Sequence, residues 1–145
     1  MERILIATDL SEMRTKVFQK GFDLAEKLGA AIELVTIVNK NIDYYPADTG
    51  LVFSDQWEAR KWIAENELQQ VKEQHPGMDI HITVCVGDPR KDIIEQAIEH
   101  DASMIVMGTR GRSDLSSTLL GSTAQYVVRH SPMPVLVVPF NHERH

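Results

Sequence analysis

The sequence predicts an α/β protein built on one doubly wound sheet of five parallel strands. Short apolar, β-branched runs alternate with longer amphipathic runs, which indicates the order β-α-β-α-β-α-β-α-β. The short runs show little polar alternation, as is typical of strands buried on both faces of a parallel sheet. Parallel neighbours require right-handed crossovers, so we expect helices on both faces of the sheet.

Five strands are expected where apolar residues run together. They are Ile4–Asp9, Ala31–Val38, Ile80–Val86, Met104–Gly108 and Pro134–Pro139. The chain's only cysteine, Cys85, lies in the third run, which favours a packed strand residue over a reactive thiol. A single cysteine also excludes an internal disulfide and a multi-cysteine zinc site.

Four amphipathic helices are expected between the strands, because apolar residues recur there at helical spacing. Gly29 ends the first helix, and Pro89 in "GDP" fits the first turn of the third. The apolar faces consist of Val17, Gly21, Leu24 and Leu28; Trp57, Ala64, Leu68 and Val71; Ile93, Ile94, Ala97 and Ile98; and Ala124, Val127 and Val128. The long irregular segment Asn39–Ser54 follows a strand end and is interpreted as a lid or, more often in such folds, as variable surface.

Length and charge narrow the class of protein. The 145 residues fit one domain, 1–145, with a structured core over about 1–140. A formal net charge of -6 argues against binding to nucleic acid or to an anionic membrane surface. No apolar stretch approaches the ~18 residues of a membrane helix, and the N-terminal run reaches Asp9 too soon for a signal peptide. We therefore expect a cytoplasmic protein without membrane insertion.

The stretch "GTRGRSDLSSTLLGSTAQ", Gly108–Gln125, has the composition of an anion site. Gly108 ends a predicted strand and Gly111 follows closely, so backbone N–H groups can approach a ligand without interference from a Cβ atom. Gly121 precedes the last predicted helix, whose N-terminus suits a phosphate. Two arginines, Arg110 and Arg112, add positive charge.

A second interpretation of the same stretch needs no ligand. Ser122 and Gln125 have the S-x-x-Q spacing of a helix capping box, and the pattern alone leaves both interpretations open. Asp9 and Glu12 raise the same question after the first strand, where Asp9 either caps a helix or faces a ligand. Neither a P-loop nor a G-x-G-x-x-G motif is present.

The predicted topology brings the residues after the first strand close to the glycine-rich stretch after the fourth. If the first and fourth strands are neighbours and the chain reverses direction there, a crevice lies between their carboxyl ends. Those ends carry Asp9 and Gly108.

The pattern Gly108-x2-Gly111-x9-Gly121-Ser122 resembles the G-x2-G-x9-G-[ST] motif of the ATP-binding branch of the universal stress proteins. The resemblance covers nearly the whole chain, including "RILIATDLSE", "GDPRKDIIEQAIEHDASMIVMGTRGRS" and "LLGSTAQYVVRHSPMPVLVVP". It implies a five-stranded sheet in the order 3-2-1-4-5, of the Rossmann-like, adenine nucleotide alpha hydrolase-like class. It also implies that ATP, with Mg²⁺, lies between strands one and four.

The resemblance implies roles for particular residues. Asp9 matches a position at the adenosine end, and the backbone of Ile37 matches one that meets adenine. With the two arginines, the predicted nucleotide-binding residues are Ala7, Asp9, Ile37, Met107, Gly108, Arg110, Gly111, Arg112, Gly121, Ser122 and Thr123. The chain departs from the family pattern at Ala7, where proline is usual, at Leu10, where glycine is usual, and at Thr123, where an aliphatic residue is frequent.

The resemblance further implies a homodimer formed through the last strand. Val135–Val138 would be an edge strand that carries no charge, and such an edge is either covered or paired with another chain. We expect a nucleotide-dependent regulatory protein of the stress response that acts on an unknown protein partner. The alternatives are a slow ATP hydrolase or phosphotransferase, since Asp9 and Asp114 form no recognisable catalytic set, and a scaffold that binds no nucleotide.

Overall fold

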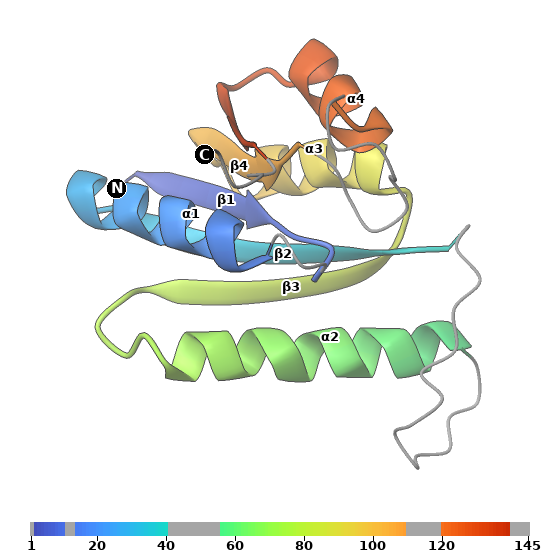
Figure 1. The fold of residues 1–145 in the computed structure, drawn as a ribbon, viewed down its shortest axis with the longest axis horizontal. Helices are drawn as coiled ribbons and strands as arrows, with labels where there is room; N and C mark the ends of the chain where they lie inside the picture. The colour runs from blue at the N-terminus through green and yellow to red at the C-terminus, as the bar shows by residue number, and fades with distance from the viewer. Residues whose placement is uncertain (1, 11–13, 41–55, 110–119, 140–145) are drawn as a thin grey trace, which may run out of the picture.

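A computed structural model describes residues 2–10, 14–40, 56–109 and 120–139. It forms one five-stranded parallel sheet in the order β3-β2-β1-β4-β5, which confirms the predicted fold (Figure 1). The strands are β1 (Arg3–Ala7), β2 (Ala31–Asn39), β3 (Ile80–Gly87), β4 (Met104–Gly108) and β5 (Val135–Val138). The helices are α1 (Arg14–Leu28), α2 (Gln56–Glu73), α3 (Pro89–Glu99) and α4 (Ser122–His130).

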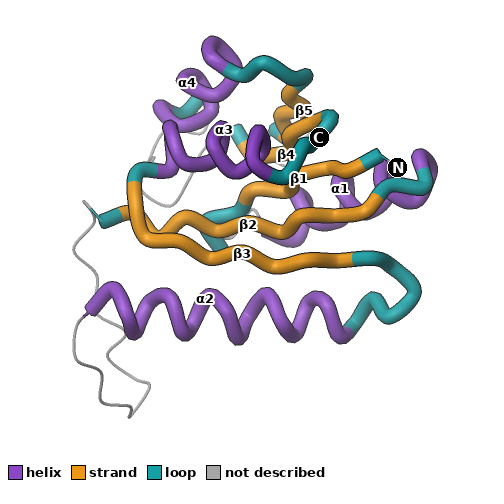
Figure 2. The backbone as a smooth tube through the Cα atoms, turned by 180° about the vertical axis from the view of Figure 1, so that it is seen from behind, coloured by secondary structure: helices purple, strands orange, loops and turns teal. Residues whose placement is uncertain are grey.

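The sheet separates two apolar clusters. Side chains alternate between the faces of a strand, so Ile4 and Ile6 join the cluster under α1 and α2, whereas Leu5 and Ala7 join the one under α3 and α4. In Figure 1 α1 lies in front of the sheet, and in Figure 2, seen from behind, α3 lies in front of it. The predicted burial on both faces holds for most of β1, β2 and β4, whereas the edge strands β3 and β5 are only partly buried.

Helix α1 lies very close to β1, and a glycine makes this possible. A Cβ atom on Gly21 would lie 2.5 Å from Cδ1 of Ile6, a fully buried residue. Glycine on the apolar face of α1 therefore allows a close approach rather than weakening the packing.

The predicted helix ends are largely correct. Gly29 follows α1 with φ of 64°, the left-handed conformation that ends helices. Pro89 occupies the first position of α3 after the N-cap Asp88. Four residues assigned to apolar faces are instead exposed: Leu28, Trp57, Ile98 and Val128. All four lie within two residues of a helix end, where fewer neighbours cover a side chain.

The central strand β1 is the point where the sheet reverses its winding. It pairs with β2 on one side and with β4 on the other, and both pairs are parallel. The chain moves outward to β3 after β2, and outward to β5 after β4. Ligands of open α/β sheets bind at the carboxyl ends of the strands at such a point. None of the described helices is long and apolar enough to cross a membrane.

Candidate functional site at the carboxyl ends of β1 and β4

The ends of β1 and β4 lie side by side at this switch point. Ile6 is in register with Val106, so Ala7 and Met107 come next on adjacent strands. Beyond them the chain continues into Thr8 and Asp9 on one side and into Gly108 on the other. The structure therefore brings together two predicted regions that are about a hundred residues apart in the sequence.

Three predicted site residues form one apolar wall. Ala7, Ile37 and Met107 are 5–6% exposed, and all three belong to the cluster on the α3 and α4 face. Their strands are neighbours, in the order β2-β1-β4. The face of the sheet under α3 and α4 is therefore apolar up to the carboxyl ends of these three strands.

The backbone of Ile37 faces the place where β1 ends. The N–H of Thr8 donates to the carbonyl of Val35 at 3.0 Å, and this is where β1 leaves β2. Backbone polar groups alternate sides along a strand, so the N–H and C=O of Ile37, two residues on, point to the same side as those of Val35. This geometry suits a ligand that pairs with the edge of β2.

The start of α4 is held against the end of β4. The N–H of Gly121 donates to the carbonyl of Thr109 at 2.6 Å. Gly121 is the N-cap, with φ of -64° and ψ of 163°, and no side chain makes the capping hydrogen bond there. The first turn of α4, which carries Ser122 and Thr123, therefore starts beside the switch point without a cap of its own.

The capping-box interpretation of Ser122 and Gln125, one of the two that the sequence left open, is wrong. The N-cap is Gly121, one residue earlier, and Ser122 is an exposed residue of the first turn. The Gln125 side chain donates its Nε2 hydrogen to the carbonyl of Leu120 at 2.6 Å and so does not return to an N-cap N–H. The long-range bond between Gly121 and Thr109 sets the helix start, and local spacing could not reveal it.

Several predicted residues lie outside the described part of the chain. These are Arg110, Gly111 and Arg112 in the glycine-rich stretch, Asp114, and Glu12, the proposed partner of Asp9 in a capping box. Asp9 itself is described and lies half-buried directly after β1. Its capping role therefore stays a prediction.

The turn after β1 adopts a glycine-like conformation without a glycine. Leu10, at the position where glycine is usual in the resembling family, has φ of 62°. A side chain in this region costs free energy, about 1–2 kcal/mol. Here the leucine side chain is only 8% exposed and joins the cluster under α1 and α2, so its burial offsets the backbone cost.

Two threonines that the sequence analysis did not single out shape the site. The Thr8 hydroxyl accepts the N–H of Leu10 at 3.0 Å and so closes the turn after β1. The Thr109 carbonyl anchors Gly121. The first contact follows a recognisable signal, a hydroxyl that bonds a backbone group two residues on, whereas the second has no local signal.

Two other reactive side chains in the described residues are Glu33 and Cys85, and Cys85 is in register with Ile37 on the neighbouring strand β3. Glu33 is buried at the amino ends of the strands, where Arg3 donates to it at 3.1 Å. Burial, and then the nearby carboxylate of Asp92, raises the pKa of the Cys85 thiol, as expected for a packed strand residue. Within residues 2–10, 14–40, 56–109 and 120–139, no three His, Cys, Asp or Glu side chains are grouped to hold a metal ion.

The fold and this edge define a doubly wound α/β protein with a candidate site at its switch point. The model of the universal stress protein family matches residues 1–139. The chain therefore belongs to the universal stress protein family.

Individual relatives agree with this assignment. The chain is 30% identical to the universal stress protein Sll1388 of Synechocystis sp., over 94% of this chain and 96% of the relative. The universal stress protein UspA from Lactobacillus plantarum has the same fold, with a TM-score of 0.81, 24% identity, and coverage of 94% of this chain and 97% of the other. A universal stress protein from Archaeoglobus fulgidus, solved in complex with dAMP, gives a TM-score of 0.61 at 20% identity, covering 94% and 97%.

Proposed function

We propose that this universal stress protein binds ATP, with Mg²⁺, between the carboxyl ends of β1 and β4, and that binding regulates a homodimer in the stress response. The observation that carries the proposal is the start of α4, where Gly121 leaves the helix without a side-chain cap beside the switch point. A helix N-terminus carries partial positive charge and N–H groups that point outward, and both favour a phosphate.

Charge also bears on the proposal. ATP is anionic and the chain carries a net charge of -6, so binding needs local compensation. The α4 N-terminus supplies part of it, Arg110 and Arg112 are proposed to supply more, and Mg²⁺ would neutralise phosphate charge. Gly108, Gly111 and Gly121 would let the backbone approach the phosphates closely.

The adenosine end is proposed to lie at β1 and β2. The wall of Ala7, Ile37 and Met107 offers an apolar surface for the base, and the backbone of Ile37 offers hydrogen bonds at its edge. Asp9, two residues after β1, is proposed to contact the adenosine end of the nucleotide. The dAMP bound to the relative from Archaeoglobus fulgidus supports an adenine nucleotide as the ligand class.

The proposed dimer uses β5, the edge strand beside β4. Val135–Val138 carries no charge, and Leu136 is 39% exposed. An uncharged apolar edge favours pairing with another chain. We expect Leu136→Lys to convert a dimer to a monomer in sedimentation equilibrium, and a wild-type monomer would refute this part of the proposal.

The decisive experiment measures ATP affinity by isothermal titration calorimetry with Mg²⁺. Gly121→Val places a branched side chain where the phosphates are proposed to lie, and we expect it to abolish binding. Gly77→Val is the matched control, because a Cβ atom at Gly77 meets nothing within 4 Å. Wild-type affinity in a folded Gly121→Val protein would refute the phosphate site, and no affinity for any adenine nucleotide would favour a scaffold.

We expect ATP to be held rather than rapidly consumed. The test is phosphate release in the same samples, with Asp9→Ala as the comparison. Fast turnover that depends on Asp9 would assign the protein to an enzyme class instead.

A further inference from the structure

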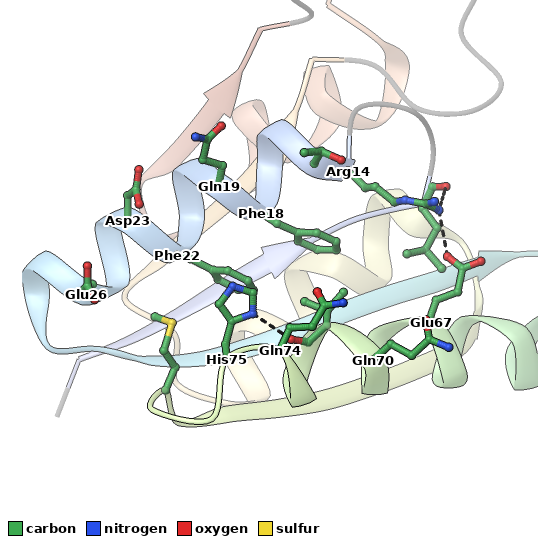
Figure 3. Close-up of a pocket in the computed structure, with 14 residues that line it drawn as sticks. Arg14, Phe18, Gln19, Phe22, Asp23, Glu26, Glu67, Gln70, Gln74 and His75 are labelled. Atoms are coloured by element: carbon green, nitrogen blue, oxygen red, sulfur yellow. Dashed lines mark hydrogen bonds and ion pairs between the residues drawn. The ribbon is translucent and has the colours of Figure 1, made fainter.

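A groove of about 880 Å³ separates α1 from α2 on the face of the sheet opposite α3 and α4. Helix α1 packs on β1 and β4, and α2 packs on β3 and β2, so the two helices stand apart. On the other face, α3 and α4 pack against each other. Leu10 and side chains of α1 from Arg14 to Glu26 line one side of the groove, and side chains between Glu67 and Met78 line the other (Figure 3).

The floor of the groove is aromatic and apolar. Phe18 and Phe22 of α1 stack with their ring centroids 5.8 Å apart, and His75, just past α2, contacts Phe22 edge-on at 4.5 Å. Figure 3 shows both phenylalanines pointing from α1 toward α2. The His75 ring is fixed by a 2.9 Å hydrogen bond between its Nδ1 and the carbonyl of Val71. The floor is therefore ordered by contacts within the chain.

The rim of the groove is polar and carries excess negative charge. Asp23, Glu26 and Glu67 line it, against one guanidinium, Arg14. Arg14 lies 2.9 Å from Glu67, which leaves Asp23 and Glu26 without a cation among the described residues. Three exposed amides complete the rim: Gln19, Gln70 and Gln74.

The length of the groove indicates an elongated partner. From Arg14 to Glu26 helix α1 advances about 18 Å, which is about three helical turns. The rim side chains of both helices are exposed, apart from the partly buried Glu67, so the groove is open rather than enclosed. A groove between two helices, with an apolar floor and polar rim, has the shape that accepts the apolar face of a third helix.

We propose that the groove between α1 and α2 binds an amphipathic helix of a partner protein, with an apolar stripe on the aromatic floor and basic side chains against Asp23 and Glu26. The negative rim selects a basic partner and gives the interaction a salt dependence. The surface lies across the sheet from the apolar wall of the nucleotide site, and the inference does not depend on ATP binding.

The test uses a labelled synthetic peptide of about 14 residues with leucine at helical i, i+3, i+4 spacing and lysine elsewhere. Fluorescence anisotropy at low salt measures its affinity, and NMR chemical-shift changes in the ¹⁵N-labelled protein locate it. We expect shifts in α1 and α2, weaker binding at high salt, and about tenfold weaker binding by the Asp23→Lys, Glu26→Lys double variant. A peptide of the same composition, with leucines spread around the helix, is expected not to bind.

The matched control is the Glu65→Lys, Glu95→Lys double variant, which makes the same charge change at exposed positions away from the groove. We expect its affinity to change less than about threefold. Equal loss in the two double variants would show that net charge alone explains the effect, and this would overturn the proposal. Chemical-shift changes centred away from the residues that line the groove would also overturn it. Displacement of the peptide by benzyltrimethylammonium would assign the groove to a small cation. Self-association of the protein that is lost only in the Asp23→Lys, Glu26→Lys variant would show that the groove binds a second copy of this chain. Either this result or the displacement by benzyltrimethylammonium overturns the proposal.

Discussion

The N-termini of α3 and α4 lie on the same face of one sheet, yet they are capped differently. At α3, Oδ1 of Asp88 accepts the N–H of Arg90 at 3.1 Å, and Oδ2 of Asp92 accepts the N–H of Asp88 at 3.1 Å. At α4, the N-cap is Gly121, and no side-chain capping bond is made. The start of α3 carries the carboxylates of Asp88 and Asp92, whereas the first turn of α4 contains no acidic residue.

This difference in capping indicates at which helix N-terminus a ligand can take the place of a side-chain cap. Two carboxylates at the start of α3 already accept the N–H groups of Asp88 and Arg90 and would repel a phosphate. The start of α4 follows β4, at the switch point, whereas the start of α3 follows the edge strand β3. The helix start without its own cap is therefore the one placed at the predicted binding edge.

The largest expected effect comes from making α4 resemble α3. Gly121→Asp gives α4 a carboxylate cap, and φ of -64° with ψ of 163° suits any L-residue. We expect ATP affinity to fall more than about 100-fold, or about 2.7 kcal/mol, since the carboxylate would compete with and repel the phosphates. Calorimetric titration measures this, and Gly121→Ser, a neutral cap, is the control. Wild-type affinity in the aspartate variant would contradict the comparison.

A smaller effect, on stability, is expected from disturbing the hydrogen bond between Asp92 and the N–H of Asp88 at the start of α3. A Cβ atom on Gly87 would lie 1.9 Å from Oδ2 of Asp92, so Gly87→Ala must displace that carboxylate from the N–H of Asp88. We expect a loss of about 1–2 kcal/mol in the free energy of unfolding by urea, with ATP affinity unchanged. In a Gly87→Ala, Asp92→Ala double variant the two losses should not add, because both remove the same contact. Full additivity would count against this explanation.

Removing the side-chain cap of α3 makes its start resemble that of α4. Asp88→Ala deletes the acceptor for the N–H of Arg90, and we expect a loss of about 1 kcal/mol of stability. Asp88→Asn keeps an acceptor oxygen and should lose much less. Urea unfolding at neutral pH measures both, and an alanine variant as stable as the asparagine variant would show that the cap contributes nothing.

The smallest expected effect is a pH dependence at the same position. Burial by itself would raise the pKa of Asp88, but hydrogen bonds from the backbone and side chain of Arg90 outweigh it, and the pKa lies below its ordinary value of 3.8. A lowered folded-state pKa stabilises the protein above about pH 3.8, and this contribution disappears as the pH falls through the folded-state pKa. The stability of wild type relative to Asp88→Asn should therefore decrease on acidification below this value. A constant difference would contradict the assignment.

Much of the candidate site could be predicted because it rests on local patterns. Asp9, Met107 and Gly108 follow or end apolar runs, so their place at the carboxyl edge follows from the strand order. The choice between Gly121 and Ser122 as the N-cap could not be predicted, because both fit a helix start and a contact with Thr109 decides it.

By itself the sequence determined the order of elements, the fold class, the end of the first helix at Gly29 and the place of Pro89 in the first turn of the third, since each depends on residues within a few positions of one another. The tertiary structure alone decided three other features: the shared wall of Ala7, Ile37 and Met107, the positive φ of Leu10, and the groove between α1 and α2. Each of these depends on strand pairing or on packing between segments far apart in the chain, where local spacing carries no information.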